Sequence, residues 1–135
     1  MAGKKHQFIV GLIIRKIREL GYEVKCIDGK TDGAFYERYP LPPTIQRHRP
    51  DVIAVDSEGN VCIGEAKTAG DLNNNRINEQ IVDFTSTDLN GKNCYVVIGV
   101  PMSCKESFEK KLKEIKAYQN DNLDVLFIPD EIIND

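Results

Sequence analysis

The chain has 135 residues, of which 41% are hydrophobic and 29% charged, with a formal net charge of −3 at pH 7. This length suits one domain spanning residues 1–135, the composition excludes disorder as the main state, and the small charge excludes only the wholesale coating of a polyanion. No stretch approaches the roughly 18 apolar residues of a membrane helix, and the four cysteines form no CxxC pair, so we expect a reduced cytoplasmic protein without membrane contact or a zinc site.

The first part of the chain predicts a helix and a strand before a long irregular segment. Residues 7–20 carry apolar side chains at helical spacing, and Gly21 follows where a left-handed residue commonly ends a helix. Tyr22–Ile27 is predicted to be a strand. The segment Asp28–Pro50 is rich in glycine and proline, with a candidate short strand at Phe35–Tyr39. A connection of this length is more often functional than idle.

The rest of the chain predicts strands and helices that alternate. In order, the predicted elements are hairpin strands at 51–56 and 61–66, a helix at 75–87, a strand at 94–100, a third helix beginning near residue 103 and a strand at 123–128. Ser103 and Glu106 have the spacing of a capping box at the start of the third helix. The order α-β-β-β-α-β-α-β predicts an α/β protein with a single mixed β-sheet flanked by helices.

The turn of the predicted hairpin decides which side chains share a face. Asp56 and Gly59 stand at the first and fourth positions that are typical of a type I turn closed by a left-handed glycine bulge. This turn places Asp51 opposite Glu65, and opposite residues of an antiparallel pair share a face. Lys67 lies on the same face as Glu65 because side chains alternate along a strand. Two acids and a base therefore end an otherwise apolar face.

This combination of residue types suits metal-assisted chemistry on a phosphate. Two carboxylates held close together repel, and Mg²⁺ relieves that repulsion because it accepts hard oxygen ligands with room left for water. A lysine at the same edge can orient or deprotonate the attacking water, or stabilise charge on a phosphate. A Glu-x-Lys pattern alone is more often a solvated alternation, but here the order, the register and the interrupted apolar face agree.

The motif Arg49-Pro50-Asp51 followed by Glu65-Ala66-Lys67-Thr68 resembles the PD-(D/E)xK superfamily of restriction-endonuclease-like nucleases. This superfamily includes Holliday-junction resolvases and RecB-type exonuclease domains. The resemblance spans residues 7–100 in element order and about 45–84 in motif. It implies a restriction-endonuclease-like αβββαβ core, to which this chain adds a C-terminal αβ unit.

The resemblance also implies roles for the motif residues. It implies that Asp51 and Glu65 bind Mg²⁺, or alternatively Mn²⁺, and that Ala66 lends a backbone carbonyl to the metal. It implies that Lys67 acts on the nucleophilic water. These assignments make Asp51, Glu65 and Lys67 the candidate catalytic cluster.

Two helices are expected to contribute to the site less directly. RecB-like members carry Gln-x-x-x-Tyr on the helix after the motif, and Gln80 followed by Phe84 is a near match, so Gln80 is a further catalytic candidate. The alternative that Gln80 only borders the apolar side of its helix stays open. Many members place an acid on the first helix, whereas this helix begins with His6 and Gln7. We expect His6 to be a solvated terminal side chain, and the alternative is that His6 substitutes for that acid.

Residues that flank the motif are candidate contacts to nucleic acid. Arg47 and Arg49 precede Asp51, and Thr68 and Arg76 follow the Glu-x-Lys strand. Such side chains at the rim of a site suit contact with DNA phosphates. A merely solvated basic loop is the alternative.

The leading hypothesis is a Mg²⁺-dependent phosphodiesterase that hydrolyses DNA, with an endonuclease favoured over an exonuclease. DNA is the expected partner, and by analogy a second copy of the chain or another protein supplies specificity. The alternative is a non-catalytic nucleic-acid-binding or assembly module on the same fold. The intact set of Asp51, Glu65 and Lys67 speaks against that module. The form of the DNA, and RNA as a substrate, are left open by the sequence.

Overall fold

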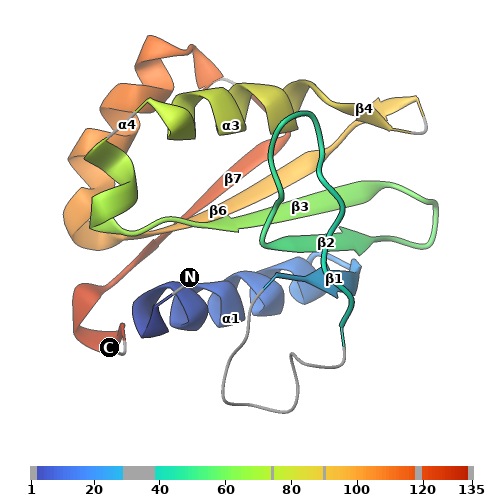
Figure 1. Cartoon of the computed structure of the whole chain (residues 1–135), viewed down its shortest axis with the longest axis horizontal. Helices are drawn as coiled ribbons and strands as arrows, with labels where there is room; N and C mark the ends of the chain where they lie inside the picture. Colours follow the sequence, from blue (N-terminus) through green and yellow to red (C-terminus); the bar gives the residue numbers. More distant parts are fainter. Residues whose placement is uncertain (1–2, 29–38, 74, 90, 118–119, 134–135) are drawn as a thin grey trace.

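A computed structural model describes residues 3–28, 39–73, 75–89, 91–117 and 120–133. Its centre is a five-stranded mixed sheet in the order β1-β2-β3-β6-β7. Helix α1 (Lys4–Glu19) covers one face of the sheet, and α3 (Arg76–Ser86) and α4 (Lys105–Glu114) lie on the other (Figure 1). The predicted α/β class, a single mixed sheet flanked by helices with an αβββαβ core and a C-terminal αβ unit, is confirmed.

The strands lie close to where the sequence predicts them. They are β1 (Glu23–Ile27), β2 (Val52–Val55), β3 (Val61–Ala66), β6 (Tyr95–Pro101) and β7 (Leu123–Ile128), with a separate pair of short strands β4 (Asp88–Leu89) and β5 (Lys92–Asn93). The short pair and the 3-10 helices at Ala69–Asn73, Met102–Cys104 and Asp130–Ile132 are additions to the prediction. They are too short to give a hydrophobic period in the sequence. Residues 35–38 of the candidate strand lie outside the described part.

The sheet changes direction at β3. Strands β1, β2 and β3 are antiparallel neighbours, whereas β3, β6 and β7 run parallel. The carboxyl ends of the three parallel strands therefore meet at one edge, where α/β proteins commonly bind ligands. The backbone N–H of Lys67, just past β3, donates to the carbonyl of Gly99 at 2.9 Å. Lys67 is thus fixed to the neighbouring strand at that edge.

Helix α1 begins at Lys4, earlier than predicted, and its last turn ends as predicted with Gly21 at φ 97°. The apolar period begins only after the exposed Lys4 and Lys5, so it could not indicate the first turn. Ile9, Ile13 and other aliphatic side chains of α1 are buried against the sheet. The earlier start places His6 within the helix.

Gly64 on β3 allows α1 to pack closely against the sheet. A Cβ built at this position would lie 2.7 Å from Ile13 Cγ2 and 3.1 Å from Val52 Cβ, both of them in the buried core. We expect Gly64→Ala to lower the free energy of unfolding by about 1–3 kcal/mol, because these branched side chains cannot retreat without strain. Urea denaturation measures the change. Gly70→Ala is the control, since nothing lies within 4 Å of a Cβ there; an equal loss in both variants would contradict the explanation.

The predicted capping box at Ser103 is wrong. Helix α4 begins at Lys105, with Cys104 at its N-cap and no capping bond from a side chain. Ser103 instead donates its hydroxyl to Asp130 Oδ2 at 2.6 Å and its backbone N–H to Asp130 Oδ1 at 2.9 Å. The Ser103 hydroxyl, which the local sequence pattern predicted to cap the helix, therefore bonds to Asp130 after β7 instead.

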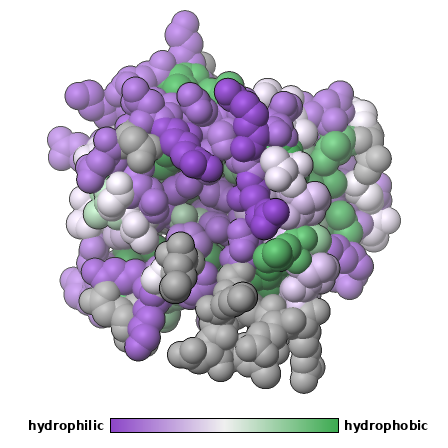
Figure 2. Space-filling view, viewed as in Figure 1, coloured by the Kyte–Doolittle hydropathy of each residue, from purple (hydrophilic) through white to green (hydrophobic). Residues whose placement is uncertain are grey.

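The surface is mostly polar on the face shown in Figure 2, where apolar side chains gather in separate small patches. The cysteines are all free, and three of the four are buried. Within the described residues, no helix combines the length and the apolar character that crossing a bilayer requires.

Candidate active site

The hairpin between β2 and β3 has the predicted register. Val55 pairs with Val61 and Val52 with Gly64, and Gly59 has φ 83°. The backbone N–H of Asp56 donates to the carbonyl of Asn60 at 3.0 Å, which closes the turn. One step beyond Val52 and Gly64, this register brings Asp51 and Glu65 together.

The two acids are interlocked through the backbone. The N–H of Asp51 donates to Glu65 Oε1 at 2.8 Å, and the N–H of Ala66 donates to Asp51 Oδ2 at 2.8 Å. Asp51 and Glu65 are 9% and 4% exposed. Each carboxylate is therefore held by the backbone next to the other, in a place with little access to water.

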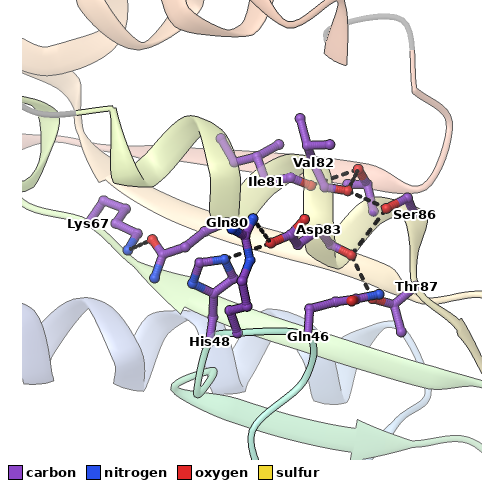
Figure 3. A network of polar contacts seen from close by, with 11 residues as sticks. Gln46, His48, Lys67, Gln80, Ile81, Val82, Asp83, Ser86 and Thr87 are labelled. Carbon is purple, nitrogen blue, oxygen red and sulfur yellow. Dashed lines mark hydrogen bonds and ion pairs between the residues drawn. The ribbon is translucent and has the colours of Figure 1, made fainter.

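Lys67 completes the cluster, and its side chain is buried. Its ammonium nitrogen is 3.1 Å from Glu65 Oε2 and also donates to Gln80 Oε1 on α3. Only 9% of Lys67 is exposed. Figure 3 shows the Lys67 and Gln80 side chains pointing toward one another. Gln80 therefore does more than border the apolar side of α3, because its amide holds the lysine.

His6 lies beside Asp51 in the candidate site. Its Nε2 lies 3.2 Å from Asp51 Oδ2, and its side chain is 18% exposed, so the expected solvated histidine is wrong. Gln7 Nε2 lies 3.4 Å from His6 Nδ1. Burial lowers the pKa of His6, but the hydrogen bond to Asp51 and the charges of Asp51, Glu65 and Asp71 outweigh it and raise the pKa overall. The neighbouring acids therefore favour the charged form of the His6 imidazole.

The pKa of Glu65 is raised from 4.5 to about 8. Burial is the main cause and the charge of Asp51 the next, while Lys67 acts in the opposite direction. Removing a carboxylate from water and placing it near a second carboxylate both disfavour the charged form. Without a cation, Glu65 therefore tends to keep its proton in the folded protein.

This shift predicts a pH dependence of stability. The folded state holds more protons than the unfolded state between about pH 4.5 and about pH 8, so in metal-free solution we expect the contribution of Glu65 to the free energy of unfolding to fall as pH rises through this window. His6, whose pKa is also raised, acts in the same direction. Urea denaturation across pH, with chelator present, should show a shallower fall for Glu65→Gln than for the wild type. Identical pH profiles for the two proteins would contradict the prediction.

The four residues predicted to contact DNA differ in exposure and in the bonds that they already make. Arg47 is 69% exposed in its side chain and lies 3.0 Å from Asp83, and Arg49 and Arg76 are exposed. Thr68 is half-buried, and both its N–H and its hydroxyl donate to Asp71 Oδ2, at 2.8 Å and 3.1 Å. The hydroxyl of Thr68 thus closes the turn after β3 and is already engaged.

Asp51 and Glu65 could supply two oxygen ligands to a cation that keeps several of its bound waters. In the described part of the chain, no group of three or more His, Cys, Asp or Glu side chains has the arrangement of a complete metal site. A metal would therefore take the two carboxylates and fill its remaining positions with backbone carbonyl, water or phosphate oxygens. Mg²⁺ is commonly bound in this way, through one or two carboxylates.

No known protein family and no curated protein matches the chain. Among solved structures, the chain is similar to the crystal structure of a repair endonuclease from Pyrococcus abyssi, with a TM-score of 0.49 and 14% sequence identity. The match covers 96% of this chain and 48% of the other, so the chain spans about half the length of that protein. The likeness is too distant to assign an activity or any site residue.

Proposed function

We propose that this protein is a metal-dependent nuclease of the PD-(D/E)xK type that hydrolyses phosphodiester bonds in DNA. The observation that carries the proposal is the buried cluster at the end of β3, where Asp51 and Glu65 are interlocked and Lys67 lies 3.1 Å from Glu65. Burying three ionisable groups costs stability unless they are paired. A chain that needed only a stable sheet would gain from apolar residues here, so the cluster favours chemistry over a non-catalytic module.

In this proposal Asp51 and Glu65, with the carbonyl of Ala66, hold Mg²⁺, and Mn²⁺ suits the same oxygen ligands. When bound, the cation supplies a Lewis acid for the phosphoryl oxygens and lowers the pKa of a bound water. Lys67 orients the attacking water and balances the negative charge that grows on the phosphate. Gln80 keeps the lysine ammonium in place, as its present contact with Lys67 indicates.

Residues around the cluster serve substrate binding in the same proposal. Arg47, Arg49 and Arg76 are exposed and provide phosphate contacts. Thr68 adds a further contact by turning its hydroxyl from Asp71 to a phosphate oxygen as a donor. We propose an endonuclease ahead of an exonuclease, with DNA as the partner. A second copy of the chain, or another protein, would supply specificity.

The test is cleavage by the purified protein of labelled linear, circular and four-way-junction DNA in Mg²⁺ and in Mn²⁺. We expect cutting with either metal and none with chelator. Cutting of the circle identifies an endonuclease, because a circle has no end. Asp51→Asn is the control for a contaminating nuclease. A folded wild-type protein that cuts none of the substrates with any metal would refute the proposal in favour of the non-catalytic module.

A further inference from the structure

The segment that leads to Asp51 is bonded to the end of β1 at its two ends: the N–H of Ile27 donates to the carbonyl of Pro40 at 3.1 Å, and the N–H of Asp28 donates to the carbonyl of Asp51 at 2.7 Å. Strand β2 begins only at Val52, and residues 40–50 contain an isolated bridge between Ile45 and His48 as their regular backbone pairing. In this bridge the N–H of Ile45 donates to His48 at 2.7 Å, and the N–H of His48 donates back at 3.0 Å. Gln46, between them, has φ 58°. Residues 45–48 thus form a tight turn between these two bonds, and the turn has a further anchor outside the sheet.

The anchor is Asp83 on α3. Its Oδ2 lies 2.8 Å from His48 Nε2 and accepts a hydrogen bond from Arg47 at 3.0 Å. Gln46 Nε2 adds a weaker contact to Thr87 Oγ1 at 3.4 Å. Figure 3 shows the turn lying along α3, with His48 directed at Asp83. One side chain of the helix therefore binds two consecutive residues of the turn.

The contact to His48 is the one that can hold the backbone. The His48 side chain is 4% exposed, whereas that of Arg47 is 69% exposed. The His48 ring also packs edge-on against Phe84, with centroids 5.7 Å apart. An exposed ion pair contributes little to stability, but a buried imidazole that loses its hydrogen bond keeps the full cost of desolvation.

The same face of α3 supports both halves of the candidate site. Gln80 and Asp83 are three residues apart, so they lie on one side of the helix, and Thr87 follows directly after its end. Gln80 holds Lys67, and Asp83 holds the turn before Asp51. Helix α3 therefore contacts both Lys67, which follows β3, and the turn before Asp51, which precedes β2.

We propose that Asp83 is a positioning residue: through His48 it ties the segment before Asp51 to α3 and so sets the position of Asp51 relative to Glu65 and Lys67. The catalytic consequence rests on the proposed function, whereas the positioning itself does not. Two backbone groups report it directly, because the N–H of Asp51 donates to Glu65 Oε1 and the N–H of Ala66 donates to Asp51 Oδ2. Both bonds require Asp51 to be in place.

Amide hydrogen exchange of the metal-free protein tests the positioning. We expect exchange at Asp51 and Ala66 to become roughly tenfold faster or more in Asp83→Ala, since a hydrogen bond with a charged partner is lost. Asp83→Asn, which keeps an accepting oxygen for His48, should restore part of the protection. Glu79→Gln is the matched control, because it removes an acid of the same helix whose charge also acts on Arg47. Unchanged exchange at both amides in Asp83→Ala, or an equal rise at amides throughout the sheet, would overturn the proposal.

Two further measurements separate the contacts and the consequence. Arg47→Ala should leave the exchange at Asp51 and Ala66 at the wild-type rate; a rise as large as that in Asp83→Ala would overturn the assignment to His48. In cleavage assays Asp83→Ala should lower kcat by tenfold or more with KM for DNA nearly unchanged, while Glu79→Gln keeps both values. A wild-type protein without nuclease activity would refute the proposed function, and the exchange rates would still decide the role of Asp83.

Discussion

Lys67→Ala is expected to reduce DNA cleavage by roughly a hundred- to ten-thousand-fold, the range for the loss of general acid–base assistance. The ammonium group is held 3.1 Å from Glu65. In the proposed mechanism it assists in the transition state, where negative charge grows on the phosphate and water gives up a proton. Loss of an interaction that is made only in the transition state lowers kcat without weakening the binding of DNA.

Because Lys67 is buried, the test needs a variant that removes its charge without leaving a cavity. Because only 9% of the residue is exposed, alanine leaves space beside Glu65, and the loss of the positive charge raises the pKa of Glu65 further. Lys67→Met is therefore the matched variant, since it fills nearly the same volume without the charge. Lys67→Arg keeps a charge in a different shape. Circular dichroism confirms the fold, binding is measured in Ca²⁺ and cleavage in Mg²⁺.

The two measurements distinguish a catalytic Lys67 from a structural one. Lys67→Met that binds DNA normally and does not cut supports the catalytic role. Cleavage within about threefold of the wild type in Lys67→Met, far below the range for acid–base assistance, would show that Lys67 is a structural partner of Glu65 only.

A divalent cation is expected to raise the melting temperature of the wild type, and Asp51→Asn is expected to abolish most of that response. A ligand at a hundred times its Kd stabilises the folded state by about 2.7 kcal/mol, which for a domain of this size is roughly 5–15 °C. In the proposed site a cation would compete with the proton on Glu65, whose pKa is raised to about 8. Asparagine keeps an oxygen for the N–H of Ala66 but removes one of the two charges that attract the metal.

Differential scanning calorimetry in Mg²⁺, Mn²⁺ and chelator measures the response. In chelator, the melting temperatures of the wild type and Asp51→Asn give the reference values from which each metal-induced shift is measured. Asp88→Asn, which removes an exposed acid from β4, should respond to metal like the wild type. An equal shift in wild type and Asp51→Asn would instead indicate non-specific binding of ions.

Much of the candidate site could be predicted from the sequence because it depends on one short hairpin. A single backbone requirement, positive φ at Gly59, fixes the register between the two strands. From that register the convergence of Asp51, Glu65 and Lys67 follows by alternation of side chains. The order of the longer elements was equally accessible, since apolar periods mark them, whereas β4, β5 and the 3-10 helices have no such period. These are local properties, which neighbouring residues determine whatever the rest of the chain does.

Tertiary packing decided the remainder. The approach of His6 to Asp51 and the bond between His48 and Asp83, which are 35 residues apart, depend on how α1 and α3 dock onto opposite faces of the sheet. Ser103 has a local capping pattern, yet Asp130 takes its hydroxyl across 27 residues. A polar side chain satisfies its hydrogen bonds with whichever group the packed core brings within reach. The spacing in the sequence therefore determined that Asp51, Glu65 and Lys67 converge. The docking of α1 and α3 onto the sheet determined which side chains contact them.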